Sequence, residues 1–293
     1  MTDLGGVFPA LLTPFDRQGQ LNEPMVEALI HHLLEAGVDG FYVGGSTGEG
    51  LLMSPQERRR LTTAAVRAAN GKAKVIVHVG ANATDDAVDL ARHAAEAGAD
   101  AVSTLPPLFF KVGDEAVIDH YARVASAGLP LIAYHIPALT GQRMTPELMA
   151  RLAEIPGVAG LKFTDNDFFL MRNLIEDGAG RWIVFNGSDE IFLCGLAMGA
   201  HGGIGSTYNV MPAAYVSLFR AFQAGDLRQA QELQFRITRA VRAIVAHPTI
   251  GALKAMMSAR GFDVGEPRRP LPPVSAAVGR QLCETLDQIF ATG

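Results

Sequence analysis

The sequence alternates eight times between an apolar run of strand length and a longer stretch with the pattern of an amphipathic helix. The apolar runs are residues 7–12, 40–43, 74–79, 101–105, 130–135, 160–163, 182–185 and 202–204. Among the helical stretches between them are residues 24–36, 55–69, 84–97, 115–127 and 146–153. Eight strand-then-helix units within about 210 residues predict an α/β fold, the (β/α)8 TIM barrel. A doubly wound sheet fits less well, because it rarely needs eight regular repeats.

The remaining residues, 211–293, read as helices at 212–224, 227–246, 249–259 and 275–291. One of them is expected to complete the eighth unit, and the others to form a C-terminal helical extension packed on the barrel. The predicted division is therefore a barrel over residues 1–210 and a helical region over 211–293. A chain of 293 residues can bury one large core without disulfides or structural metal.

Composition excludes several classes of protein. The net charge is −5, with no run of five like charges, which argues against nucleic acid as a partner. No stretch has the roughly 18 apolar residues of a membrane span, and no signal peptide is evident. The two cysteines, Cys194 and Cys283, form no C-x-x-C pair, so free thiols and a cytoplasmic location are expected. No histidine and carboxylate cluster has the spacing of metal ligands, so no metal is predicted.

In such a barrel, the chemistry is expected at the carboxyl ends of the strands. Lys162 lies near the end of the sixth apolar run, and strand alternation places it on the inner face with Gly160, opposite Leu161 and Phe163. Desolvation disfavours the charged ammonium and leaves more of the amine that attacks a carbonyl to form a Schiff base. Two structural roles are alternatives to this nucleophilic one: Lys162 could form an ion pair with an inward carboxylate, or its side chain could extend to the barrel rim with its amine in water.

Tyr134 ends the fifth apolar run, on the strand expected beside that of Lys162. A phenol next to an amine can move protons while a carbinolamine loses water. A tyrosine that fills the rim with its hydroxyl in water fits the position equally well.

The loop after the second apolar run, GGSTGE at 44–49, offers the hydroxyls of Ser46 and Thr47 and unhindered N–H groups suited to a carboxylate. It is also a common type of turn, and it lacks a nucleotide-binding glycine pattern.

Polar residues also follow the seventh strand. Asp189 and Glu190 could bind the hydroxyls of a polyol, whereas Ser188 or Asp189 could cap a helix over residues 191–198. His78 and His135 lie in or beside strands, where structural roles are favoured.

Five segments occur in register: FYVGGSTGE (41–49), YHIPALTG (134–141), LK (161–162), NGSDE (186–190) and GGIGSTYN (202–209). Together they resemble the N-acetylneuraminate lyase branch of the dihydrodipicolinate synthase superfamily. The resemblance implies a class I aldolase on a (β/α)8 barrel, usually a homotetramer, with neither metal nor organic cofactor. It implies that Lys162 forms the Schiff base with pyruvate or a 2-keto sugar acid, and that Tyr134 and Thr47 are catalytic. The substrate-binding positions that it implies are Ser46, Thr47, Thr164, Gly187, Asp189, Glu190 and Ser206.

The function expected from this resemblance is cleavage or condensation of a 2-keto sugar acid, first of all N-acetylneuraminate to pyruvate and N-acetylmannosamine. A 2-keto-3-deoxy sugar acid aldolase or dehydratase is an open alternative. Dihydrodipicolinate synthases usually carry an arginine shortly after the tyrosine, and Pro137, Ala138 and Leu139 stand there instead, which argues against lysine biosynthesis. From a different class, a phosphate-binding barrel or a catalytically silent ligand-binding barrel also stays open.

Two departures from the family pattern bear on the substrate. Phe109 and Phe110 stand where the family usually has tyrosines, one of which reaches into the neighbouring subunit's site. In the family this tyrosine hydroxyl completes a proton relay with the loop hydroxyl and the tyrosine of the fifth strand. Phenylalanine lacks that hydroxyl, so water or another group must replace it in the relay, or the reaction is slower. Ser188 stands where sialic acid lyases tend to have a larger residue.

Overall fold

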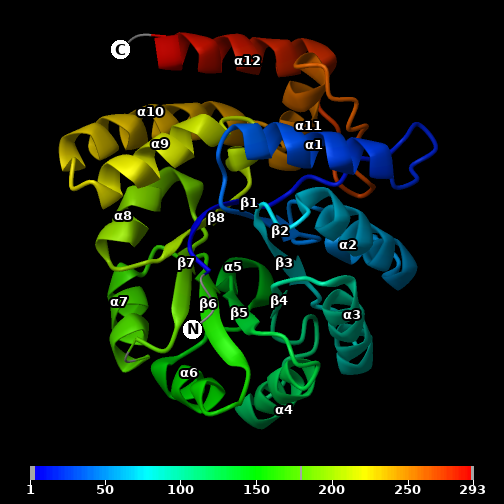
Figure 1. Cartoon of the computed structure of the whole chain (residues 1–293), viewed down its shortest axis with the longest axis vertical. Coiled ribbons are helices and arrows are strands. Elements are labelled where there is room, and N and C mark those ends of the chain that lie inside the picture. Colours follow the sequence, from blue (N-terminus) through cyan, green and yellow to red (C-terminus); the bar gives the residue numbers. More distant parts are fainter. Residues whose placement is uncertain (1–3, 179, 292–293) are drawn as a thin grey trace.

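The computed structural model, which describes residues 4–178 and 180–291, contains eight parallel strands around a common axis (Figure 1). They are β1 (Gly6–Pro9), β2 (Gly40–Val43), β3 (Lys74–His78), β4 (Ala101–Thr104), β5 (Leu131–His135), β6 (Val158–Phe163), β7 (Ile183–Asn186) and β8 (Gly202–Gly205). Their order is β1-β8-β7-β6-β5-β4-β3-β2, and the Leu11 N–H closes the barrel by donating to the Tyr42 carbonyl at 2.9 Å. The predicted (β/α)8 barrel is confirmed.

Helices surround the strands and continue beyond them. In chain order they are α1 (Glu23–Glu35), α2 (Pro55–Ala69), α3 (Thr84–Ala97), α4 (Asp114–Ala125), α5 (Pro137–Thr140), α6 (Pro146–Ala153), α7 (Phe168–Asp177), α8 (Phe192–Ala197), α9 (Pro212–Gln223), α10 (Leu227–Val245), α11 (Thr249–Ala259) and α12 (Ala276–Ala291). Short 3-10 turns, η1 (Gly50–Leu52), η2 (Asp189–Ile191) and η3 (Thr207–Asn209), follow β2, β7 and β8.

Local sequence explains where the helices begin. Ser54 caps α2, because its hydroxyl accepts a hydrogen bond from the Glu57 N–H and the Glu57 carboxylate accepts one from the Ser54 N–H. Pro55 occupies the first helical position. Thr145 caps α6 in a similar way, followed by Pro146. These caps satisfy N–H groups that have no partner within the helix, so both helices start where the sequence predicts.

The apolar core has two layers that follow from strand alternation. Inward side chains such as Phe8, Ile132 and Phe185 fill the barrel, and a larger outer layer packs the strands against the helices. Phe8, Ile132 and Phe185 are fully buried, so the polar residues at the carboxyl ends of the strands adjoin an apolar interior.

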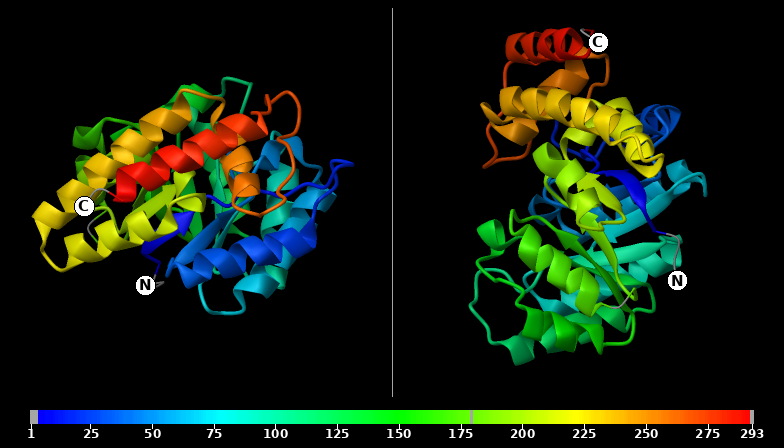
Figure 2. Two further views of the ribbon diagram at one scale, coloured as in Figure 1. Left: turned by 90° about the horizontal axis from the view of Figure 1, so that it is seen from above. Right: turned by 90° about the vertical axis from the view of Figure 1, so that its left-hand side faces the viewer.

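The C-terminal helices lie at one end of the molecule. Figure 1 shows α12 outermost, next to α11, with α10 beside α9, and Figure 2 shows the same stacking from two further directions. Residues 262–274 contain no helix or strand and return from α11 to α12 past the loop that follows β2. Within residues 4–178 and 180–291, no helix is both long and apolar enough to cross a lipid bilayer.

Candidate active site

Lys162 lies on the inner face of β6, with only 5% of the residue exposed. In the sheet it pairs with Tyr134 of β5 on one side and Phe185 of β7 on the other. Phe163, the next residue, faces outward and stacks on His135, with ring centroids 4.8 Å apart. The inward position predicted for Lys162 from strand alternation is therefore confirmed.

Two tyrosine rings surround the Lys162 amine. Its Nζ lies 4.2 Å from the ring centroid of Tyr134 and 4.2 Å from that of Tyr42. The two rings stand nearly perpendicular to each other, with an interplanar angle of 81°. No carboxylate in the described part of the chain forms an ion pair with Lys162, so the alternative of an inward acidic partner is wrong. The predicted meeting of Tyr134 and Lys162 is confirmed.

Three residues that the sequence reasoning did not assign to the site, Tyr42, His78 and Ser103, complete its polar interior. The Tyr42 hydroxyl donates to Ser103 Oγ at 3.0 Å. The His78 ring lies 6.1 Å from the rings of both Tyr42 and Tyr134. Each of the three lies two positions after another inward residue of its strand, so strand alternation alone could have identified them.

His78 lies in surroundings that disfavour the charged form of its imidazole. Its Nδ1 lies 3.2 Å from the Gly44 carbonyl, which can only accept, so Nδ1 carries the proton. Burial lowers the pKa of His78 well below its usual value, and the positive charges of Arg58 and Lys162 add to this effect. Its Nε2 is buried without a hydrogen-bond partner in the described structure. The structural role predicted for His78 stays a prediction, and the structure places its ring beside Tyr42 and Tyr134.

Arg58 of α2 holds the end of β3 from outside the barrel. Its guanidinium donates to the carbonyls of His78 at 2.7 Å and Gly80 at 2.8 Å. Burial lowers the pKa of Arg58 to about 10. These bonds fix the backbone on which His78 stands.

The 44–49 loop after β2 presents its hydroxyls to solvent. Ser46 is exposed and Thr47 half-buried, and neither hydroxyl has a hydrogen-bond partner among the described residues. The backbone curls tightly, because Gly44 and Glu49 both have a positive φ, of 71° and 57°. The Thr13 hydroxyl donates to the Gly48 carbonyl at 2.6 Å. The loop therefore holds two free hydroxyls in a constrained backbone.

Asp189 uses its carboxylate within the protein. Its Oδ2 accepts from the N–H and the hydroxyl of Thr207, both at 2.7 Å, and from the Ser206 hydroxyl at 3.2 Å. Burial raises the pKa of Asp189. The prediction that Ser188 or Asp189 caps a helix is wrong: α8 begins at Phe192, and its first turn has no side-chain cap. Asp189 instead ties the end of β7 to the segment after β8.

The other predicted substrate positions lie at the ends of β6, β7 and β8. The Thr164 hydroxyl oxygen is buried without a partner in the described structure. Gly187 lies directly against it, since a Cβ at this glycine would come within 1.9 Å of that oxygen. Glu190 is exposed and Ser206 half-buried. Only Gly leaves room for the Thr164 side chain between these strand ends.

The loop between β4 and α4 carries two exposed aromatic residues. Phe109 is 89% exposed and Phe110 70% exposed, and their rings meet edge to face at 5.1 Å. Phe109 also has a φ of 67°, which a side chain of its size rarely adopts. Across the described residues, no three or more His, Cys, Asp or Glu side chains gather in a way that could bind a metal ion.

The fold and the site define a class of protein: a barrel enzyme with a buried lysine between two tyrosines, and with free hydroxyls in the loop after β2. The chain belongs to the dihydrodipicolinate synthetase family, whose model matches residues 3–289. It is 38% identical to the N-acetylneuraminate lyase of Citrobacter koseri over 93% of this chain and 92% of that protein. The protein is a carbon–carbon lyase of the aldolase type.

Solved structures agree. A variant of the Ruminococcus gnavus sialic acid aldolase, altered at its catalytic lysine, superposes with a TM-score of 0.96 at 28% identity, over 99% of each chain. CdNal from Clostridium difficile, in complex with mannosamine, superposes with a TM-score of 0.94 at 30% identity, over 99% of this chain and 100% of that one. These likenesses extend over the barrel and the C-terminal helices together.

Proposed function

We propose that the protein is a Schiff-base aldolase that splits a 2-keto sugar acid into pyruvate and an aldehyde, or joins the two. N-Acetylneuraminate, which would give pyruvate and N-acetylmannosamine, is the first substrate to test. The observation that carries the proposal is the Lys162 amine, buried inside the barrel and 4.2 Å from the Tyr134 ring. The likeness to N-acetylneuraminate lyases and to a structure that holds mannosamine supports the choice of substrate.

The chemistry follows from an amine in this position. Lys162 Nζ attacks the C2 ketone, and the resulting carbinolamine loses water to give an iminium. Loss of the C4 hydroxyl proton breaks the C3–C4 bond, and the released electron pair moves into the iminium to give an enamine. The aldehyde leaves, C3 takes up a proton, and water hydrolyses the imine to release pyruvate and the free lysine. Tyr134, with Thr47, is the group proposed to move these protons.

The substrate carboxylate is proposed to bind the 44–49 loop. Ser46 and Thr47 offer unused hydroxyls there, and a protein of net charge −5 must hold an anion by local contacts. The sugar chain would lie over the ends of β6 to β8. Thr164, Gly187, Glu190 and Ser206 are the proposed contacts, together with Asp189, which holds the Ser206 hydroxyl in place.

The proposal includes three further points. The intermediate is the covalent imine on Lys162, so neither metal nor organic cofactor takes part. The assembly is a homotetramer, supported by the exposed Phe109 and Phe110. The location is cytoplasmic, as expected from the sequence.

The decisive experiment is reduction by borohydride in the presence of pyruvate. We expect a mass increase equal to a reduced pyruvate imine on the peptide that contains Lys162, and none in Lys162→Ala. An unmodified Lys162 in the wild-type protein at saturating pyruvate would rule out the proposed function. Tight binding of a phosphosugar, with no reaction of pyruvate, would favour the phosphate-binding barrel instead.

A panel of 2-keto acids, followed by detection of pyruvate, decides the substrate. A second candidate, a 2-keto-3-deoxy sugar acid aldolase or dehydratase, is favoured by the small side chain of Ser188 and by the missing tyrosine hydroxyl at the Phe109–Phe110 pair. Faster turnover of a 2-keto-3-deoxy sugar acid than of N-acetylneuraminate would select this second candidate. Dihydrodipicolinate synthesis is the third, disfavoured by Pro137, Ala138 and Leu139.

A further inference from the structure

Glu49, the last residue of the 44–49 loop, has a carboxylate that is completely shielded from solvent. Its side chain is 0% exposed, and it forms an ion pair at 2.6 Å with Lys254 of α11, whose side chain is 1% exposed. Lys254 Nζ also donates to the Glu266 carbonyl at 3.1 Å and lies 4.3 Å from the centre of the Phe15 ring. A charge pair so deeply buried needs both partners, because either charge alone would be left without solvation.

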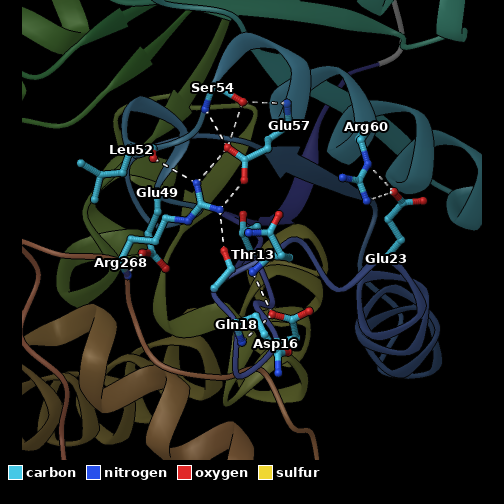
Figure 3. A network of polar contacts seen from close by, with 12 residues as sticks. Thr13, Asp16, Gln18, Glu23, Glu49, Leu52, Ser54, Glu57, Arg60 and Arg268 are labelled. Atoms are coloured by element: carbon cyan, nitrogen blue, oxygen red, sulfur yellow. Dashed lines mark hydrogen bonds and ion pairs between the residues drawn. The ribbon is translucent and has the colours of Figure 1, made fainter.

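The second Glu49 oxygen binds the segment between α11 and α12. The Arg268 N–H donates to Glu49 Oε2 at 2.6 Å. The Arg268 guanidinium in turn forms a two-pronged pair with Glu57 and donates to the carbonyls of Leu52 at 3.1 Å and Gly19 at 2.8 Å (Figure 3). These bonds lower the pKa of Glu57 to about 2. The C-terminal region is thus attached to the segment that follows the 44–49 loop.

Glu49 has a backbone conformation that needs such support. Its φ is 57°, in the left-handed region that non-glycine residues seldom occupy. Such a conformation persists only where the surrounding structure holds it. Gly50 follows immediately, and a Cβ there would lie 1.8 Å from the Gly44 carbonyl oxygen, so the loop closes on itself at this residue. The side-chain contacts of Glu49 therefore hold the backbone at the end of the loop that carries Ser46 and Thr47.

We infer that Glu49 is a positioning residue for the carboxylate-binding loop, held by Lys254 and the Arg268 backbone, so that the C-terminal helical region completes this part of the site. The inference rests on the proposed function, in which Ser46 and Thr47 bind the carboxylate of pyruvate. Glu49 itself does not touch substrate. Its contribution is the orientation of the two hydroxyls, which sets the affinity for pyruvate more than the rate of bond breaking at Lys162.

The experiment measures the pyruvate concentration that gives half-maximal trapping of Lys162 by borohydride. We compare the wild type with Glu49→Gln, Lys254→Met and the double variant. The double variant removes both charges, so it leaves no lone buried ion and is expected to fold even where a single variant does not. We expect the half-maximal concentration to rise by about tenfold or more in each folded variant, with Lys162 still modified at saturation.

Glu23→Gln is the matched control, because it removes a carboxylate from the exposed Glu23–Arg60 pair, which Figure 3 shows near the same network. Its half-maximal pyruvate concentration should equal that of the wild type. If the double variant is folded and also matches the wild type, the inference is wrong while the proposed function stands. If the wild type is not trapped at all, both are wrong.

Discussion

At the scale of single residues, the Lys162 amine lies beside two aromatic rings, and no carboxylate among the described residues forms an ion pair with it. A carboxylate partner would hold the amine in its protonated, unreactive form. Ring faces attract a cation by about 0.5–2 kcal/mol, so they can favour a cationic nitrogen without forming an ion pair with it. The same faces of Tyr42 and Tyr134 remain beside Nζ when it becomes part of an iminium. The site thus suits the cationic iminium intermediate.

Tyr134→Phe keeps the ring over Lys162 and removes only the hydroxyl. General acid–base groups contribute about 100- to 10,000-fold to rate, so we expect kcat for pyruvate release to fall by about 100-fold or more, with KM changed only a few-fold. Tyr121→Phe is the control, because this hydroxyl donates to the Thr104 carbonyl at 3.1 Å in the outer layer of the core. Equal effects of the two substitutions would contradict a proton-moving role for Tyr134.

At the scale of elements, each strand is predicted from its apolar run, with differences only at the ends. β6 begins at Val158, two residues before the predicted start, and β1 ends at Pro9, three residues before the predicted end. The short helix α5 was not predicted, because four residues are too few for a helical period to be visible. The 44–49 loop was predicted as a carboxylate site, yet its attachment through Glu49 was not. A local pattern does not reveal a partner far along the chain.

The loop between β4 and α4 is the element on which the proposed assembly depends. Large exposed aromatic side chains are favoured at interfaces between subunits. We expect the wild-type protein to sediment as a tetramer, and a Phe109→Ser, Phe110→Ser double variant to shift toward smaller species. Far-UV circular dichroism should be unchanged, which would separate loss of assembly from loss of fold. A wild-type protein that sediments as a monomer would overturn the proposed tetramer.

At the scale of the whole molecule, buried histidines link stability to pH. Burial lowers the pKa of His78, His120 and His135 in the folded protein. In the unfolded chain a histidine titrates near 6.5, so below this pH the unfolded state binds protons that the folded state does not. The free energy of unfolding should therefore fall as the pH drops below about 6.5, and should be independent of these groups above it.

His78→Asn tests this linkage. Each neutral buried histidine contributes a slope of about 1.4 kcal/mol per pH unit between its unfolded and folded pKa values. Urea unfolding at fixed protein concentration, between pH 5.5 and 6.5, should show a slope smaller by about 1 kcal/mol per pH unit in the variant, because the unfolded histidine is only partly protonated near its pKa of 6.5. An unchanged slope would mean that His78 takes up its proton in the folded protein as readily as in the unfolded chain.

The sequence alone determined the barrel and the inward direction of Lys162, because the period of two in strands and the longer period of helices are local properties. It also indicated Tyr134 as the neighbour of Lys162, since consecutive parallel strands pair. Only the tertiary structure decided that two tyrosine rings lie beside the amine, with no ion pair to a carboxylate in the described part of the chain. It also decided that Asp189 binds Thr207 and not a helix end. The contact between Glu49 and Arg268, 219 positions apart, likewise depends on how the C-terminal helices pack, which no local pattern encodes.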